Sequence, residues 1–293
     1  MSLNQPIVVG TDGSTAATNA VRWAARQSRI HNLPLRIVTA LDGPPQYWGD
    51  FALPSTYIAE STAHAKERLA EAQRIAVEGG AHSITTDVLT GFAHVDLITE
   101  SKNAHTLVLG SRGLSAVKAN IIGSVTHSVA SYVHSPLVVV HDLPFGWDRK
   151  PLAPVVVGVD GSEHNRAAVD AAFKEADRLG TELIAVHAWS DTALPRALSL
   201  HKGLPWADLI TEEEARLAES LAGWKEQYPD VDVRRVVIKE KPARYLAELS
   251  SAASLVVVGS RGRGGFAGML LGSTSRSLLH SCQCPLMTVP GDR

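Results

Sequence analysis

Short runs of apolar, mostly β-branched residues recur along the chain, separated by longer segments with apolar residues at helical spacing. A strand that is apolar at every position is typical of a parallel sheet covered on both faces. Each half of the chain holds five such runs. They are Ile7–Val9, Leu35–Ala40, Ser83–Leu89, Thr106–Leu109 and Leu137–Val140, then Val155–Val159, Leu183–Ala188, Val233–Ile238, Leu255–Val258 and Leu286–Val289.

The segment after the first strand of each half predicts an amphipathic helix. Ser14 and Ser162 precede these segments and are of the residue type favoured at a helix N-cap. Strands that alternate with helices predict a doubly wound α/β domain in each half, with a five-stranded parallel sheet flanked by helices. The apolar helix faces are Ala17, Ala20, Val21, Ala24, Ala25 and Ser28 in the first half, and Ala168, Val169, Ala172, Phe173 and Ala176 in the second.

The chain repeats itself with a period of 148 to 149 residues. IVVGTDGS at 7–14 returns as VVGVDGS at 156–162, and LVLGSRG at 107–113 returns as VVVGSRG at 256–262. This period is far longer than the roughly 20–50 residues of a solenoid repeat, so each copy is expected to be a whole domain.

The join between the copies is rich in proline, which disfavours helix. We predict a first domain over 1–143, a linker over 144–153 and a second domain over 154–293.

Composition narrows the class of partner. Lys and Arg total 28 and Asp and Glu total 30, which gives a formal charge of -2 for the 293 residues. Nucleic acid and anionic membranes favour a concentrated basic face, so neither is expected as a partner. The two cysteines, Cys282 and Cys284, are too few for a disulfide framework. No signal-peptide pattern and no run of about 18 apolar residues is present, so we expect a soluble protein of the cytoplasm.

An aspartate follows the first strand of each half, at Asp12 and Asp160. In doubly wound sheets ligands bind beyond the carboxyl ends of the strands, where the strand order reverses. Two interpretations stay open for these residues. The carboxylate forms the turn by accepting hydrogen bonds from nearby amides, or it accepts a hydrogen bond from an amine or hydroxyl of a ligand.

A glycine block follows the fourth strand of each half. The first reads Gly110-Ser-Arg-Gly113, then nine residues, then Gly123-Ser124, and its copy runs from Gly259 to Ser273. Glycine lets a backbone approach a ligand closely, and the Gly-Ser pair opens a helix whose N-terminal amides favour a phosphate. The alternative is that these loops need glycine only for positive φ. Neither block is a Walker A loop or a Rossmann fingerprint, because the lysine is missing and the blocks follow the fourth strand.

The pattern Gly-x2-Gly-x9-Gly-Ser after strand four, with an Asp after strand one, resembles the universal stress protein family. The resemblance is to its ATP-binding, tandem two-domain form common in actinobacteria, and it covers nearly the whole chain. It implies a Rossmann-like fold of the adenine nucleotide alpha hydrolase type, with ATP at both sets of strand ends and Mg²⁺ carried mainly by the triphosphate. It also implies that the domains pair through their fifth strands and that two chains form a homodimer.

On that resemblance, the residues that contact ATP lie at the ends of the first, second and fourth strands and at the start of the helix after the glycine block. In the first half they are Gly10, Asp12, Ala40, Gly110, Ser111, Arg112, Gly113, Gly123, Ser124 and Val125, and in the second half Gly158, Asp160, Ala188, Asp191, Gly259, Ser260, Arg261, Gly262, Arg263, Gly264, Gly265, Gly272, Ser273 and Thr274.

The two glycine blocks continue differently. Arg263-Gly264-Gly265 stands where the first half has Leu114-Ser115-Ala116, so the second loop has an extra cation and a freer backbone. We therefore expect the second site to bind ATP more tightly.

Three classes of function are compatible with this pattern. The first is a nucleotide-dependent regulator in stress response or growth control, and the second is a slow ATP hydrolase or phosphotransferase. The third is a structural module with empty pockets. Catalysis would need a positioned base near the γ-phosphate, and no carboxylate or histidine is repeated beside the glycine blocks, so we assign no catalytic residue. The histidines show no metal-ligand spacing, and His187 among them is expected to be a packing residue.

Overall fold

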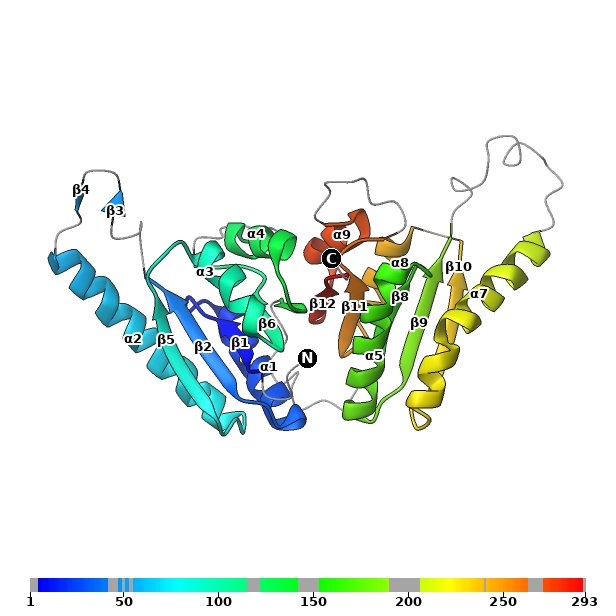
Figure 1. Ribbon diagram of the computed structural model, residues 1–293, viewed down its shortest axis with the longest axis horizontal. Helices are drawn as coiled ribbons and strands as arrows, with labels where there is room; N and C mark the ends of the chain where they lie inside the picture. Colours follow the sequence, from blue (N-terminus) through cyan, green and yellow to red (C-terminus); the bar gives the residue numbers. More distant parts are fainter. Residues whose placement is uncertain are drawn as a thin grey trace. The chain divides into compact units, whose positions relative to one another are not determined.

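The computed structural model describes residues 5–41, 47–48, 51–52, 55–114, 122–141, 153–189, 206–239, 241–262 and 271–291. The chain forms two compact units, Met1–Arg149 and Lys150–Arg293, here called the first and second units (Figure 1). The expected linker over 144–153 lies outside the described residues, apart from Ala153. Its boundaries therefore stay a prediction.

The first unit is a five-stranded parallel sheet in the order β5-β2-β1-β6-β7. Helices α1 and α2 pack together against the sheet, and α3 packs on α4 (Figure 1). A short antiparallel pair, β3 and β4, was not predicted by the sequence pattern. The elements are β1 (Ile7–Gly10), α1 (Thr15–His31), β2 (Leu35–Ala40), β3 (Tyr47–Trp48), β4 (Phe51–Ala52), α2 (Ser55–Glu78), β5 (Ile84–Leu89), α3 (Ala93–Glu100), η1 (Ser101–Asn103), β6 (Thr106–Gly110), α4 (Ser124–Tyr132) and β7 (Leu137–Val140).

The second unit repeats this topology, with a parallel sheet in the order β10-β9-β8-β11-β12. The predicted fold, two doubly wound α/β domains with five parallel strands each, is thus confirmed. The elements are β8 (Val155–Val159), η3 (Glu163–Asn165), α5 (Arg166–Leu179), β9 (Leu183–Ala188), α7 (Trp206–Gln227), β10 (Val233–Ile238), α8 (Pro242–Ser250), β11 (Leu255–Gly259), α9 (Ser273–Ser281) and β12 (Leu286–Val289).

In the first unit β1 lies between β2 and β6, and in the second unit β8 lies between β9 and β11. In the first unit Ile7 of β1 is in register with Leu35 of β2 on one side and Thr106 of β6 on the other. The chain reaches β2 directly but reaches β6 only after crossing the sheet, so the strand order reverses between β1 and β6. This is the point where doubly wound sheets bind ligands.

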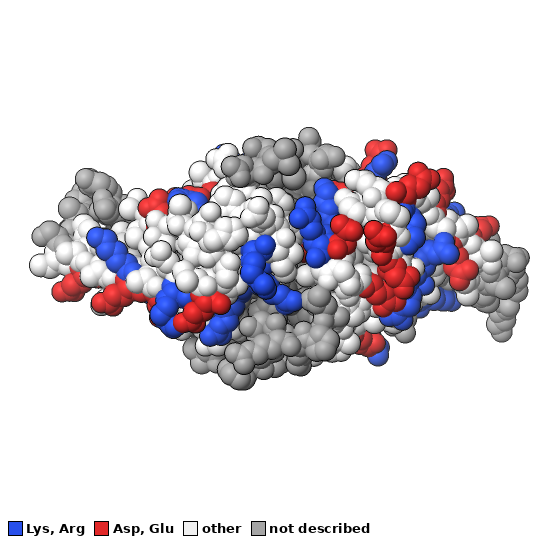
Figure 2. Space-filling model, turned by 90° about the horizontal axis from the view of Figure 1, so that it is seen from below, with Lys and Arg blue, Asp and Glu red and all other residues white. Residues whose placement is uncertain are grey.

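The predicted helix faces form the cores of the units. Every residue of the two faces is buried, and Phe173 is fully so. Phe173 stacks on Trp224 and Tyr228, with ring centroids 6.4 and 5.8 Å apart. The exposed side chains carry charges of both signs, which lie interspersed over the described residues on the face drawn in Figure 2.

One of the two expected helix caps is wrong. Ser14 caps α1 as predicted, because its Oγ accepts a hydrogen bond from the amide of Ala17 at 3.2 Å. In the second unit the short helix η3 precedes α5, whose N-cap is Asn165. The Ser162 hydroxyl instead donates to Asp160 Oδ1 at 2.7 Å. Because η3 stands between Ser162 and α5, the first amides of α5 follow Asn165 and not Ser162.

Candidate functional site

A cavity of about 450 Å³ opens in the first unit where the carboxyl ends of β1 and β6 meet. It brings together residues from β1, β2 and β6, the glycine block and the start of α4. Ser111 lies beneath the lining, and its amide donates to the Val140 carbonyl at 2.8 Å. The other predicted first-unit residues all line the cavity: Gly10, Asp12, Ala40, Gly110, Arg112, Gly113, Gly123, Ser124 and Val125.

Asp12 connects the turn after β1 to the glycine loop after β6. Its Oδ1 accepts a hydrogen bond from the Ser14 amide at 3.0 Å, and its Oδ2 accepts one from the Leu114 amide at 2.9 Å. Ser14 adds a third link, since its hydroxyl donates to the Arg112 carbonyl at 3.2 Å. The turn-forming interpretation of Asp12 is therefore confirmed. Each carboxylate oxygen retains a second lone pair that a ligand can use.

The block glycines are not required for positive φ. Gly13 and Gly161, in the turns after β1 and β8, do have positive φ, whereas no glycine of either described block does. The alternative that the blocks need glycine for positive φ is therefore wrong. Close approach explains them instead, because a Cβ at Gly110 would lie 2.7 Å from the backbone of α1. A Cβ at Gly113 would lie 2.5 Å from Asp12 Oδ2.

Helix α4 points its N-terminus at the cavity. Its N-cap is Gly123, which offers no side-chain acceptor to the first amides of the helix. Ser124, Val125 and Thr126 line the cavity, and the hydroxyl of Thr126 donates to the Gly110 carbonyl at 2.8 Å. Uncapped amides and the positive end of the helix dipole favour an anion at this wall.

One cation at the cavity was not predicted from the sequence. Arg68 of α2 lines it, and Nη2 of Arg68 donates to the Ala40 carbonyl at 3.1 Å. The tetrapeptide Arg-Leu-Ala-Glu at 68–71 recurs at 216–219, 148 residues later, so the repeat contained a signal for this position. Thr11, Thr39 and Thr126 also line the cavity and were not predicted, and the other lining residues that were missed are apolar, among them Val38, Leu89 and Leu97.

The second unit places the corresponding residues in the same arrangement. Asp160 Oδ1 accepts hydrogen bonds from the amide and the hydroxyl of Ser162, at 2.8 and 2.7 Å. A Cβ at Gly262 would lie 2.8 Å from Asp160 Oδ2. Of the predicted second-unit residues, the structure describes Gly158, Asp160, Ala188, Gly259, Ser260, Arg261, Gly262, Gly272, Ser273 and Thr274, whereas Asp191, Arg263, Gly264 and Gly265 lie outside the described residues.

The glycine blocks of both units are closed by matching hydrogen bonds. The Gly123 amide donates to the Ser111 carbonyl at 2.9 Å, and the Gly272 amide donates to the Ser260 carbonyl at 2.7 Å. In the second unit, the Ser275 hydroxyl donates to the Gly259 carbonyl at 2.6 Å, as that of Thr126 does to Gly110. The second unit therefore has the backbone frame of the first.

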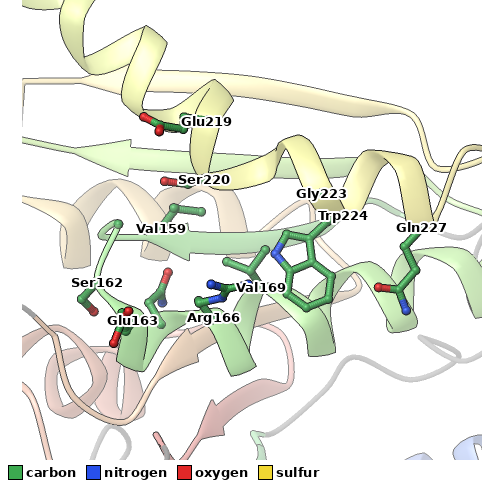
Figure 3. Close-up of a pocket in the computed structure, with 12 residues that line it drawn as sticks. Val159, Ser162, Glu163, Arg166, Val169, Glu219, Ser220, Gly223, Trp224 and Gln227 are labelled. Carbon is green, nitrogen blue, oxygen red and sulfur yellow. The ribbon is translucent and has the colours of Figure 1, made fainter.

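A different groove of about 400 Å³ lies between α5 and α7 of the second unit (Figure 3). Trp224 and Gln227 project from α7, whereas Glu163 and Arg166 come from η3 and α5 (Figure 3). None of the predicted site residues lines this groove. Val159, Gly161 and Ser162 of the repeated segment 156–162 do line it, whereas none of the described glycine-block residues of this unit does.

The described part of the chain offers neither a metal site nor a membrane-spanning helix. No group of three or more His, Cys, Asp or Glu side chains there is placed to hold a metal ion. No helix there is both long and apolar enough to cross a membrane.

Comparisons with known proteins agree with the repeat and the fold. Residues 4–141 and 152–290 each match the Universal stress protein family. Universal stress protein Rv1996 of Mycobacterium tuberculosis is 40% identical to this chain, and the match covers 99% of this chain and 96% of Rv1996. Universal stress protein Rv2623 of the same organism is 36% identical, covering 96% and 95%.

A solved structure supports the architecture. A universal stress protein from Archaeoglobus fulgidus superposes with a TM-score of 0.68 at 23% identity, covering 98% of both chains. At this identity the likeness concerns the fold alone. Together with two tandem family matches and relatives similar over their whole length, it leads to one conclusion: the chain belongs to the universal stress protein family.

Proposed function

We propose that this chain binds ATP at the strand ends of both units and acts as a nucleotide-dependent regulator in stress response or growth control. The observation that carries the proposal is the first-unit cavity, which joins an apolar wall to an anion-binding wall. Val38, Leu89 and Leu97 supply apolar surface for a base, and the α4 amides face the place of the phosphates. Its volume of about 450 Å³ is within the range of small-molecule pockets, about 300–1,000 Å³.

The residues present fit an adenine nucleotide. Asp12 and the backbone at Ala40 would face the base or ribose, and Arg112 and Ser124 would face the phosphates. Mg²⁺ would arrive with the triphosphate, since phosphate oxygens supply much of the coordination that this ion prefers.

Regulation is favoured over catalysis by the state of Asp12, the one carboxylate among the described residues that line the cavity. Both of its oxygens accept amide hydrogen bonds, and none of the described lining residues is a histidine. A hydrolase would need a base free to orient the attacking water. Steady-state turnover above about 1 s⁻¹, the low end for ordinary enzymes, would favour the hydrolase.

Calorimetric titration of ATP into full-length protein with blocking variants tests the proposal. Gly113→Glu and Gly262→Glu each push a side chain against the aspartate of one unit. We expect two ATP per chain for wild type, one for each single variant and none for the double variant. Wild-type protein that binds no added ATP, and releases no adenine nucleotide on heating, would refute the proposal.

The same titrations rank the two sites. The Gly113→Glu variant retains only the second site, and the Gly262→Glu variant retains only the first. We expect the smaller Kd in the Gly113→Glu variant, because Arg263 adds a cation to the second loop. Equal Kd values would contradict this ranking but not the binding itself.

Arg68→Ala tests the cavity lining by removing a side chain and not by adding one. Arg74→Ala is a matched control. Arg74 lies on the same helix but is exposed and paired with Glu71 and Glu78. We expect weaker ATP binding at the first site of Arg68→Ala and unchanged binding in Arg74→Ala. Equal effects of the two substitutions would argue against a ligand beside Arg68.

A further inference from the structure

A buried histidine in the second unit has both ring nitrogens bound. His187 of β9 is 2% exposed. Its Nδ1 lies 2.7 Å from the Val159 carbonyl oxygen, and its Nε2 lies 2.9 Å from Glu213 Oε2 of α7. The Glu213 side chain is 13% exposed, and its other oxygen accepts a hydrogen bond from Arg216 at 2.7 Å. His187 was expected to be a packing residue, and none of these bonds was predicted from the sequence.

These partners determine how many protons the pair holds. A carbonyl oxygen and a carboxylate can only accept hydrogen bonds, and a neutral imidazole has a single N–H to donate. Both bonds of His187 therefore form only when the His187–Glu213 pair holds one proton more than a neutral imidazole beside a carboxylate. Arg216 donates to the carboxylate and favours its ionised form. The extra proton is thus assigned to the imidazole.

The His187–Glu213 pair lies beside the candidate site of the second unit. Val159 is the last residue of β8 and precedes Asp160, and His187 precedes Ala188 at the end of β9. The two bonds of His187 thus join α7 to the turn that carries Asp160. If the pair loses its extra proton, one of the two bonds is lost.

The first unit has no such pair. Thr39 and Ala65 stand 148 residues before His187 and Glu213, in the register set by the recurring Arg-Leu-Ala-Glu motif. Both are buried, at 2% and 0% exposure, and neither side chain titrates. The arginines of this motif differ accordingly, because Arg68 donates to the Ala40 carbonyl whereas Arg216 donates to Glu213.

Other charged groups lie on the elements that surround β9. His187 contacts the Val159 carbonyl and Glu213, and Glu213 also accepts the hydrogen bond from Arg216. The remaining charged residues described on the elements next to β9 are Asp160 after β8, Arg234, Arg235 and Lys239 on or after β10, Arg166, Asp170, Lys174, Glu175, Asp177 and Arg178 on α5, Glu212, Glu214, Glu219, Lys225 and Glu226 on α7, and Arg244 and Glu248 on α8.

We propose that the His187–Glu213 pair is a proton-holding element that positions the Asp160 turn, so that ATP binding weakens in the second unit when the pair loses its proton. The first unit lacks this dependence. The part concerning ATP rests on the proposed function, whereas the proton held by the pair does not.

Histidine NMR on the ligand-free full-length chain tests the pair directly. With ¹⁵N-labelled histidine, the His187 signals are assigned by their loss in His187→Asn. We expect protons on both ring nitrogens near neutral pH, and one fewer proton on the ring in Glu213→Ala. A ring protonated at one nitrogen only, in a wild-type chain that is folded, would overturn the proposal.

ATP titrations across pH test the consequence for binding. In the Gly113→Glu variant only the second site binds ATP, and in the Gly262→Glu variant only the first site does. The ATP phosphates titrate equally in both variants, so their effect on affinity cancels when the two sites are compared. Loss of one hydrogen bond is expected to raise the Kd about three- to tenfold. We expect the second site to lose about that much more affinity than the first between pH ~6 and pH ~9.

The chain supplies its own control. His187→Thr with Glu213→Ala installs the first-unit residues in the second unit, and we expect ATP binding to persist with the pH profile of the first site. If this double variant does not fold, His187→Asn replaces it, since an amide keeps a donor near the Val159 carbonyl that does not titrate.

The two proposals fail in different ways. Equal pH profiles of the two wild-type sites, or a profile unchanged by the substitutions, would overturn the role of the pair. Absence of ATP binding in both backgrounds at every pH would instead refute the proposed function, while the NMR result still decides whether the pair holds the proton.

Discussion

Replacing Gly113 with alanine tests whether the contact between Asp12 and the glycine loop supports the site. The added Cβ would lie 2.5 Å from Asp12 Oδ2, closer than any real Cβ contact. The carboxylate must therefore move away from the Leu114 amide, with which it forms a bond of 2.9 Å. Gly113 has no positive φ, so backbone strain adds nothing to this effect.

The size of the effect follows from the bond that is lost. A hydrogen bond is worth about 0.5–1.5 kcal/mol net, and more when one partner is charged. Leu114 is 69% exposed, so water replaces part of the lost bond. We expect the free energy of unfolding to fall by about 1 kcal/mol, and the Kd of the first site for ATP to rise about fivefold.

Urea denaturation and ATP titration measure these two quantities. Gly123→Ala is the control for stability, because its nearest neighbour would lie at an ordinary contact distance of 3.6 Å. A change within about 0.5 kcal/mol is expected for the control. The reasoning is refuted if Gly113→Ala is as stable as wild type and binds ATP equally well, or if Gly123→Ala destabilises the chain as much.

Three further outcomes are expected. Gly110→Ala should lower the free energy of unfolding by about 1–3 kcal/mol in urea, because the new Cβ meets the α1 backbone at 2.7 Å; wild-type stability would contradict this. Phe173→Ala should cost about 3–5 kcal/mol in the same assay, since this ring is fully buried, and a loss below 1 kcal/mol would not fit. As pH rises, iodoacetamide should label Cys282 before Cys284 under partly unfolding conditions, as followed by mass spectrometry. The hydrogen bond between the thiols lowers the pKa of Cys282 and raises that of Cys284, and burial adds to the latter, so labelling in the reverse order would count against this assignment.

The sequence predicts the strands well where they are buried on both faces, as β7 and β9 are, whereas β5 and β10 are partly exposed. In β2, β7 and β9 the predicted run and the strand coincide. The repeat adds information that one copy lacks, because equal spacing of Asp12 and the glycine block in both halves selects one edge of each sheet. Local pattern and repetition therefore suffice for the fold and for the position of the candidate site.

Contacts between distant residues were not predictable in this way. Arg68 occupies an ordinary polar position on an amphipathic helix, and only the folded structure brings it to the Ala40 carbonyl. His187 and Glu213 are 26 residues apart and lie on different elements. The cap expected at Ser162 failed because a short helix, η3, which the apolar pattern does not reveal, precedes α5.

The His187–Glu213 pair also constrains how the two halves could have diverged from one ancestral domain. Converting Thr39 and Ala65 into such a pair, or the reverse, takes two substitutions. A glutamate gained alone would leave a buried carboxylate without its partner, which costs several kcal/mol, whereas a histidine gained alone can stay neutral and donate one hydrogen bond. A stepwise route between the two arrangements is therefore least unfavourable when the histidine is gained first or lost last.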